Sequence, residues 1–366
     1  MTRLLWAQVK AVIRLELKKT FFAKRGIWIY AVAALPIVLF IAYAVAMSNE
    51  QHKTVKIARG GEKQLSYQDL LAIKSGMARN EVLSILGKPP GNFHWTGRRP
   101  TGPAANEEVF REDYHYSDGQ NDLNLGLVAG KVEGINLRES YNLGEDVVRF
   151  AGVFQVFFLR LAIFFGCLGV FMNLFRGEVL DKSLHFYFLA PIRREVLMAG
   201  KFLAGFLATS TIFVTSELLQ TAAFLWHFDP RARDLYLYHH HGLEHTAIYV
   251  GVTVLACIGY GAFFLVAGML FRNPLIPAAA VLIWELINPF LPALLKQFSV
   301  IYYLKSLCPV EIPVSPGTPG LLALLISNAD PISPPLAIAG ILTVTLIALA
   351  ISGVQVRRME INYTTE

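Results

Sequence analysis

Charged residues are scarce in this chain. Asp, Glu, Lys and Arg make up 16% of its 366 residues, whereas soluble domains carry about 25%. Hydrophobic residues make up 54%, and apolar runs of about 20 residues, each enough to cross a hydrocarbon core of roughly 30 Å, recur along the sequence. The shortage of charge excludes an ordinary soluble domain. It predicts an α-helical polytopic membrane protein.

Cysteine is also rare, and nucleotide-binding loops are missing. The three cysteines are too few for a disulfide framework. The Gly-Lys pairs at 87–88, 130–131 and 200–201 lack a glycine five positions earlier and are not followed by Ser or Thr. A phosphate-cradling loop is therefore excluded. We expect no catalytic residues, no cofactor on this chain, and no enzyme activity of its own.

Four histidines cluster after the third apolar run, at His239, His240, His241 and His245. The segment 241–245 spells the His-x-x-Glu-His pattern of one metalloprotease class. That pattern needs a large soluble catalytic domain and a distant third ligand, which a loop of about 20 residues does not supply. We expect a solvated histidine cluster and no metal site, with adventitious metal binding as the alternative.

The apolar runs predict six membrane spans. They fall at 27–47, 151–175, 202–226, 246–271, 275–295 and 335–356. Seven basic residues precede the first span, which places the N-terminus in the cytoplasm by the positive-inside rule. Six crossings return the tail at 357–366 to the same side, in agreement with Arg357 and Arg358. Because the basic residues flank spans, the net charge of +6 does not indicate nucleic-acid binding.

The N-terminal segment 1–26 contains an amphipathic helix at 3–19. Its apolar face carries Leu5, Val9, Val12 and Ile13, and its basic face carries Arg3, Lys10, Arg14 and Lys18. This pattern is typical of a helix that lies in the membrane interface. The alternative is a basic membrane-proximal stretch without a specific role.

Residues 48–146 form a polar insert between the first two spans. Residues 67–73 and 79–86 read as helices, the second ended by Gly87. Three strands are expected, at 108–117, 122–128 and 131–138, with turns at 117–119 and 129–131. The insert is therefore expected to be a small extracytoplasmic α+β domain.

The segment Ser75-Gly-Met-Ala-Arg-Asn-Glu-Val-Leu-Ser-Ile-Leu-Gly-Lys-Pro89 resembles the motif of the BamE (SmpA/OmlA) family. The later strands with Tyr114-His115-Tyr116 and with Gly130 to Ile135 fit that family too. The resemblance covers about 65 residues and implies two helices on a three-stranded antiparallel sheet. It implies protein–protein contact rather than chemistry.

A polar connector at 176–201 lies between the second and third spans. Its Pro-x-x-Arg turn at Pro191 and Arg194, and the Gly200-Lys201 pair that opens the next span, resemble the coupling-helix loop of ABC type-2 exporter permeases. The resemblance extends over the N-terminal elbow helix, the six spans and the short apolar stretches within 297–334. In that family such stretches are short outer-leaflet helices; a plain external loop is the alternative.

The resemblance implies a transmembrane subunit of the bacterial inner membrane, with both termini cytoplasmic and the insert periplasmic. It implies lipid contact, a second permease chain in a homo- or heterodimer, and separate ABC ATPase subunits that hold ATP and Mg²⁺. The helix at 178–189 would dock the ATPase. The docking residues would be Glu178, Asp181, Lys182, Leu184, His185 and Phe188.

Three ionisable residues fall inside predicted spans, namely Arg160, Glu217 and Glu285. Charges at this depth are costly, so each should face the protein interior or water. They could line a translocation path or form a gate. Alternatively, Arg160 makes a static pair with Glu217 or Glu285.

Two other functions fit the sequence. The chain could be a membrane-anchored envelope assembly or scaffold protein that acts through its insert. It could also be an ATP-independent carrier, although we find no internal repeat of the kind that many carriers show.

Overall fold

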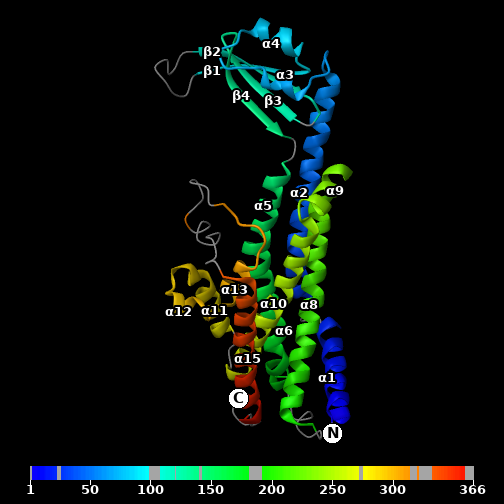
Figure 1. Cartoon of the computed structure of the whole chain (residues 1–366), viewed down its shortest axis with the longest axis vertical. Coiled ribbons are helices and arrows are strands. Elements are labelled where there is room, and N and C mark those ends of the chain that lie inside the picture. The colour runs from blue at the N-terminus through cyan, green and yellow to red at the C-terminus, as the bar shows by residue number, and fades with distance from the viewer. Residues whose placement is uncertain are drawn as a thin grey trace. The chain divides into compact units, whose positions relative to one another are not determined.

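The computed structural model describes residues 2–22, 26–98, 108–119, 121–139, 142–180, 192–271, 275–313, 320 and 332–358. The chain divides into two compact units (Figure 1). Met1–Ile41 and Val147–Glu366 form a helical unit, and Ala42–Asp146 form an α+β unit.

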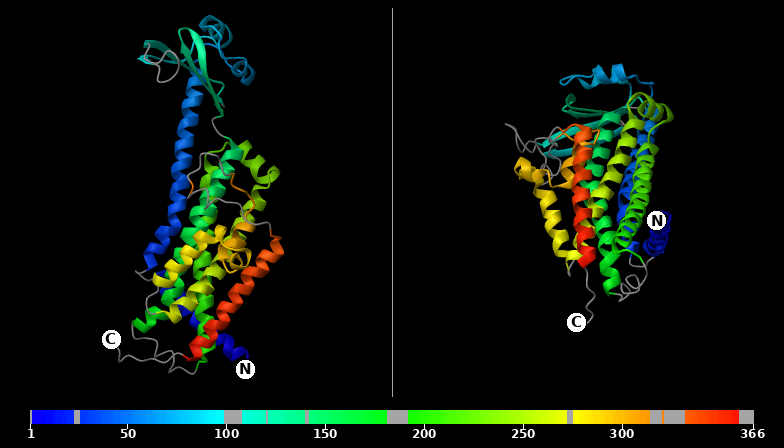
Figure 2. Two further views of the ribbon diagram at one scale, coloured as in Figure 1. Left: turned by 90° about the vertical axis from the view of Figure 1, so that its left-hand side faces the viewer. Right: turned by 60° about the horizontal axis from the view of Figure 1, so that its bottom comes forward.

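Five helices are long and apolar enough to cross a membrane, as expected for a helical membrane protein. They are α2 (Ile27–Gly60), the continuous run Leu143–Phe175, α8 (Arg194–Trp226), α10 (Gly242–Leu270) and α15 (Pro334–Arg358). Figures 1 and 2 show the second to fifth of these running alongside one another, with α1 (Thr2–Phe22) against α8. Several are longer than the sequence predicts: α2 continues past 47, and α8 begins before 202.

The second of these helices has an unexpected middle section. It begins as α5 (Leu143–Gly152), widens into the π-helical segment η2 (Val153–Ala162) and continues as α6 (Ile163–Leu180). π-helical turns are rare and occur frequently at functional sites. Arg160 lies within η2.

The fifth expected span, 275–295, is not one long helix. It consists of α11 (Leu275–Ile287), the short turn η3 (Asn288–Phe290) and α12 (Ala293–Lys296), and α13 (Val300–Ser306) follows. Pro289 and Pro292 explain the interruption, because proline lacks the backbone donor that would continue a helix. The structure thus contains five helices long enough to be spans, and the predicted span at 275–295 is divided into short helices.

Helices α10 and α15 run in the same direction. Gly259 of α10 lies beside Ile341 of α15, where an added Cβ would meet Cγ2 at 3.6 Å. Toward the C-terminal end of α10, Gly268 packs against Met172 of α6, and toward the C-terminal end of α15, Arg357 forms an ion pair with Glu195 of α8 (2.6 Å). These two partners lie at the same end of the bundle, because Lys201 near the start of α8 bonds to Leu174 of α6. The segment between α10 and α15 must therefore lead back along the bundle.

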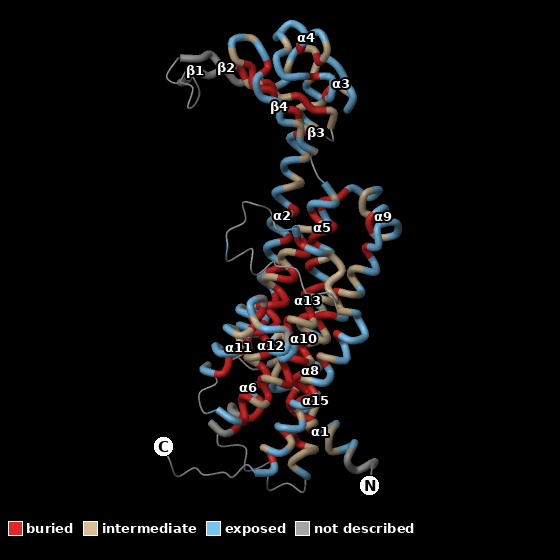
Figure 3. Tube along the Cα trace, turned by 60° about the vertical axis from the view of Figure 1, so that its left-hand side comes forward, coloured by how far each residue is buried: buried red, intermediate tan, exposed pale blue. Residues whose placement is uncertain are grey.

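Aromatic side chains fill the interior of the helical unit. Phe164 of α6 contacts Tyr260 and Phe264 of α10, with ring centroids 5.5 and 4.9 Å apart. Near the other end of α10, Phe154 lies 4.4 Å from Tyr249. Figure 3 shows buried residues concentrated along the facing sides of these helices. A short helix, α9 (Pro230–His239), follows α8 and is capped by Asp229.

The α+β unit contains a four-stranded antiparallel sheet in the order β1-β2-β3-β4. Its strands are β1 (Gly91–Arg98), β2 (Glu108–Ser117), β3 (Asn121–Val128) and β4 (Lys131–Glu139). Three of them agree with the sequence prediction. The expectation of a three-stranded sheet is wrong, because β1 pairs with β2 from Gly91 opposite His115 to Arg98 opposite Glu108.

The two helices of this unit, α3 (Tyr67–Leu71) and α4 (Arg79–Leu86), cover the sheet. Their buried side chains share a core with alternate residues of the strands: Leu70, Ile73, Val82, Leu86, Tyr114, Tyr116, Leu123, Leu125, Leu127 and Val132. Gly87 ends α4 with φ of 77°, which glycine adopts without strain. The Tyr116 hydroxyl donates to the Gly87 carbonyl (3.0 Å), so the sheet also fixes the end of α4.

Candidate functional site: a buried charge cluster

The amphipathic character of α1 places one acidic residue on its buried side. Val12 and Glu16 lie one turn apart and are both buried, whereas Lys10, Arg14 and Lys18 are exposed. Glu16 is the only acidic residue between positions 2 and 22. A carboxylate on a buried face needs a positive partner, because an unpaired buried charge is very costly.

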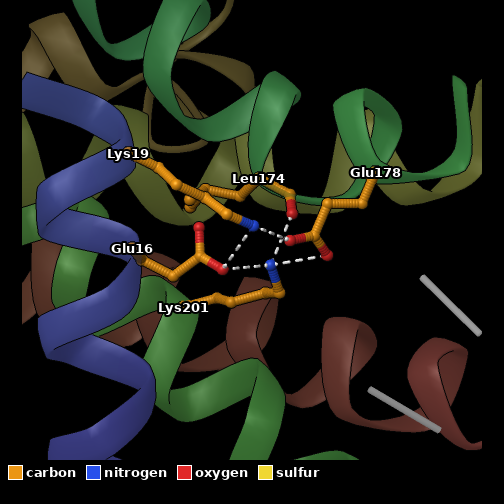
Figure 4. Close-up of polar contacts among 5 residues, drawn as sticks. All are labelled: Glu16, Lys19, Leu174, Glu178 and Lys201. Atoms are coloured by element: carbon orange, nitrogen blue, oxygen red, sulfur yellow. Dashed lines mark hydrogen bonds and ion pairs between the residues drawn. The ribbon is translucent and has the colours of Figure 1, made fainter. Parts of the chain in front are cut away.

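That partner is Lys201 of α8. Its side chain is fully buried, and its Nζ lies 2.8 Å from Glu16 Oε1 and 2.8 Å from Glu178 Oε2. Nζ also donates to the Leu174 carbonyl oxygen at 2.9 Å and lies 5.4 Å from the centre of the Phe175 ring. One ammonium group therefore joins α1, α6 and α8 (Figure 4).

A second lysine completes the cluster. Lys19 Nζ donates to Glu178 Oε1 at 3.0 Å and lies 3.9 Å from Glu16 Oε1. The cluster thus contains two lysines and two glutamates, and its formal charge is zero. Such balance is what allows four ionisable groups to share a largely buried position. We refer to Glu16, Lys19, Glu178 and Lys201 as the charge cluster.

Gly200 brings α1 close enough to α8 for the charge cluster to form. A Cβ at Gly200 would lie 2.9 Å from Cγ1 of Val12, closer than real Cβ contacts. The Gly200-Lys201 pair therefore has a local physical role: the glycine admits the neighbouring helix, and the lysine bonds to it.

The predicted docking residues are only partly described. Glu178 is buried in the charge cluster, where both of its carboxylate oxygens face lysine ammonium groups. The remaining docking residues, Asp181, Lys182, Leu184, His185 and Phe188, lie outside the described residues. Glu178 lies near the end of α6, which is described to Leu180, and Lys201 lies near the start of α8, which begins at Arg194.

No family model matches the sequence, and no curated protein matches it significantly. Functional inference for this chain therefore depends on its own residues.

The three charged residues that the sequence predicts to lie inside spans are all buried, but they do not come together as one group. Within the described residues, neither Glu217 nor Glu285 lies at ion-pair distance from Arg160. Glu217 accepts a hydrogen bond from Thr221 in its own helix (3.1 Å). Glu285 Oε2 accepts from the Ser299 hydroxyl at 2.6 Å and from the Ile301 amide at 3.1 Å, and Oε1 accepts from the Val300 amide at 3.0 Å.

Glu285 therefore caps the first turn of α13 from a different helix. The first amides of a helix have no partner within the helix and carry partial positive charge, and a carboxylate accepts their hydrogen bonds. The static pair with Arg160 that the sequence suggests is replaced by this cap.

The histidine cluster lies at the turn between α9 and α10, where His241 adopts a left-handed backbone conformation with φ of 57°. His241 Nδ1 lies 2.8 Å from Glu244 Oε2, and both side chains are largely exposed. Among the described residues, no group of three or more His, Cys, Asp or Glu side chains is arranged to hold a metal ion.

Two members of the charge cluster were not found from the sequence. Glu16 and Lys19 were read only as parts of a basic amphipathic helix. A signal for Glu16 did exist: it follows Val12 by one turn, in a helix with no other acidic residue. Lys19 carries no such signal, because basic residues surround it.

Proposed function

We propose that this chain is the permease subunit of an ATP-driven exporter and that a separate ATPase subunit binds the connector between α6 and α8. The charge cluster is the observation that carries this proposal. It ties α1 to both ends of the connector at 176–201, through Glu178 near its start and Lys201 at its end.

The charge cluster gives a physical route for coupling. A partner that moves the connector would pull on Glu178, which is bonded to Lys201 and Lys19. Because the contacts of Lys201 with Glu178 and Glu16 are buried and short, the displacement would pass to α8 and α1 together. An exposed ion pair would transmit little, because its net interaction is weak and its side chains reorient easily.

Helix directions are consistent with six crossings. Because α10 and α15 run the same way, the chain between them must return, and α11 and α13 would provide that return in two pieces joined by Glu285. Both chain termini would then lie in the cytoplasm, where α1, the start of α8 and the end of α15 meet. The α+β unit would be periplasmic, and the chain would work in the inner membrane with a second permease chain.

The experiment is purification of the tagged full chain from its native membrane in mild detergent, followed by mass spectrometry and an ATPase assay. We expect an ABC ATPase to co-purify with the wild type and to be lost with the double variant Leu184→Asp and Phe188→Asp. The control is Leu71→Asp, an exposed leucine of the α+β unit. Absence of any ATPase from the wild-type preparation would contradict the proposal.

A scaffold protein is the second candidate, because the α+β unit has a core of its own. In that case the purification would recover envelope proteins that bind through residues 48–146. Their loss with Leu71→Asp, without any ATPase, would favour this second function.

A further inference from the structure

A second buried polar region surrounds Arg160. The side chain is 2% exposed, and two of its guanidinium nitrogens, Nε and Nη1, are buried. Neither nitrogen makes a hydrogen bond within the described part of the chain. A buried guanidinium normally has a carboxylate or several carbonyl oxygens as partners. Arg160 therefore lacks the partners that its burial requires.

The nearest acidic group does not meet that need. Glu285 lies within electrostatic range of Arg160, but its two oxygens accept three hydrogen bonds from Ser299, Val300 and Ile301. Lys305 of α13 also lies within electrostatic range of Arg160 and repels it. The region thus holds two cations and one carboxylate that is already engaged by a helix start.

Hydroxyl groups of α10 face the same interior. Tyr249, Thr253 and Tyr260 are spaced by four and seven residues, which places them on one side of the helix. Their hydroxyl oxygens are buried and make no hydrogen bond among the described residues. Tyr260 contacts Phe164 at the start of α6, one turn after Arg160, and it lies within electrostatic range of Arg160.

Each of these unsatisfied groups destabilises a ligand-free protein, because a buried polar atom without a partner has lost its hydrogen bonds to water and gained none in return. Arg160, on a π-helical segment, and Tyr260 next to it show the pattern of a polar site prepared for something that the protein chain does not supply.

We propose that Arg160, together with the Tyr260 hydroxyl, binds an oxyanion — a carboxylate or a phosphate — carried by the molecule that this chain transports. The inference rests on the proposed function and specifies the substrate class. A guanidinium fits an oxyanion better than any other side chain does, because its planar fork can donate two parallel hydrogen bonds.

The first test measures anion binding by the purified full chain in dodecyl maltoside, without any ATPase. The probes are dodecyl phosphate and inorganic phosphate, and the readouts are calorimetric affinity and the rise in melting temperature. We expect wild type to bind dodecyl phosphate and Arg160→Gln to bind it about 10- to 100-fold more weakly, the usual value of a hydrogen bond to a charged group. The control Arg138→Gln removes an arginine from β4 and should bind like wild type.

The two probes distinguish the sources of the oxyanion. Binding of dodecyl phosphate alone indicates the head group of an amphiphile, and binding of both probes indicates a free anion. Failure of wild type to bind either probe would overturn the inference, as would equal binding by Arg160→Gln.

A second variant separates a binding role from a structural one. Arg160→Met keeps most of the side-chain volume and removes the unpaired charge. We expect its melting temperature without ligand to exceed that of wild type, and its response to dodecyl phosphate to be lost. A lower melting temperature, or failure to fold, would mean that Arg160 supports the fold, and the inference would be wrong.

These outcomes are independent of the test of the proposed function. Co-purification of an ATPase without any binding of the probes would retain the exporter and reject the oxyanion site. Binding without an ATPase would retain the site and reject the exporter.

Discussion

The helical unit contains two buried polar regions that are built in opposite ways. In the charge cluster, two lysines and two glutamates compensate one another at distances of 2.8 to 3.9 Å. In the region of Arg160, its guanidinium and the Tyr260 hydroxyl are buried without hydrogen-bond partners in the described chain. The first region has the properties of a fixed joint between helices, and the second has those of a site that awaits a ligand.

The difference shows that burial of charge does not by itself indicate function. A compensated cluster holds elements together, and removing one member is costly because the others are left uncompensated. An uncompensated group already carries that cost, so removing it should relieve the protein. The sign of the stability change therefore distinguishes the two kinds of region, and the following predictions use that sign.

The largest effect is expected for Lys201→Met. Loss of the ammonium would leave Glu16 and Glu178 buried next to each other with Lys19 as their remaining neighbour in the cluster. We expect a loss of about 3–5 kcal/mol in the free energy of unfolding, the usual cost of breaking a buried ion pair. The measurement is thermal or denaturant unfolding of the full chain in detergent.

Lys53→Met is the matched control. Lys53 pairs with Glu50 at 2.7 Å, but both side chains are more than 60% exposed. We expect a change of less than about 0.5 kcal/mol, as for other exposed pairs. If the two lysine variants were equally stable, the charge cluster would not be a joint.

The next effect is expected for Glu285→Ala. This change leaves the Ser299 hydroxyl and the amides of Val300 and Ile301 without their acceptor, although all three groups are buried. We expect a loss of about 2–4 kcal/mol, since hydrogen bonds to a charged group contribute about 1.5–3 kcal/mol each and are not additive.

Glu285→Gln refines this result. The amide keeps one acceptor oxygen, so we expect a smaller loss than for alanine in the same unfolding measurement. If Arg160→Met stabilised Glu285→Ala more than it stabilises the wild type, the two residues would be coupled as a pair after all, and the contrast between the two regions would weaken.

A smaller effect is expected for Gly200→Ala. The new Cβ would lie 2.9 Å from Val12 Cγ1, so α1 must move away from α8. We expect a loss of about 1–3 kcal/mol, the usual result of overpacking. The double variant with Val12→Ala should recover part of it, because Cγ1 is gone while the Cβ of residue 12, at 3.0 Å, remains.

Gly251→Ala of α10 provides the control, because nothing lies within 4 Å of the added atom. Alanine favours a helix over glycine by about 0.5–1 kcal/mol, so this variant should be neutral or slightly more stable. A loss as large as that of Gly200→Ala would mean that helix packing at Val12 is not the cause.

The long helices and most of the α+β unit could be predicted from the sequence, because their signals are local. Apolar runs set α10 and α15, and the turn around Gly130 (φ 75°) sets the hairpin of β3 and β4. Strand β1 was missed, although its sequence from Gly91 to Arg98 contains Phe93 and Trp95 in alternation. The residues before it, Gly87, Pro89 and Pro90, are typical of a loop and obscure the start of the strand.

The site could be predicted only in fragments, because its contacts join distant positions. Lys201 and Glu178 were singled out for other reasons, whereas their partner Glu16 lies 185 residues before Lys201 in the chain. The cap of α13 by Glu285 was missed for the same reason. Nothing in the sequence indicates the π-helical segment that carries Arg160, since its composition is that of an ordinary apolar helix.

The smallest expected effect on stability concerns a carboxylate outside the two buried regions. Asp69 lies in the first turn of α3, where hydrogen bonds from the Ser66 amide and hydroxyl hold the pKa of Asp69 below its ordinary value. A lowered pKa in the folded state means that the stabilisation is complete above the unfolded pKa of about 3.9 and disappears as the pH falls through the folded value.

We therefore expect hydrogen exchange in α3, normalised for intrinsic rate, to be unchanged between pH 7 and pH 5 and to accelerate modestly below pH 4. Asp69→Asn should show the faster exchange at every pH and lose the pH dependence, whereas Asp113→Asn, which removes the partner of Arg111 on β2, should exchange like wild type in α3. Global unfolding should change little, because an exposed cap stabilises only its own helix turn. If Asp69→Asn unfolded the whole chain, this carboxylate would contribute as much to the free energy of unfolding as the buried charge cluster does. That result would contradict the conclusion that burial determines how much a charged group contributes to stability.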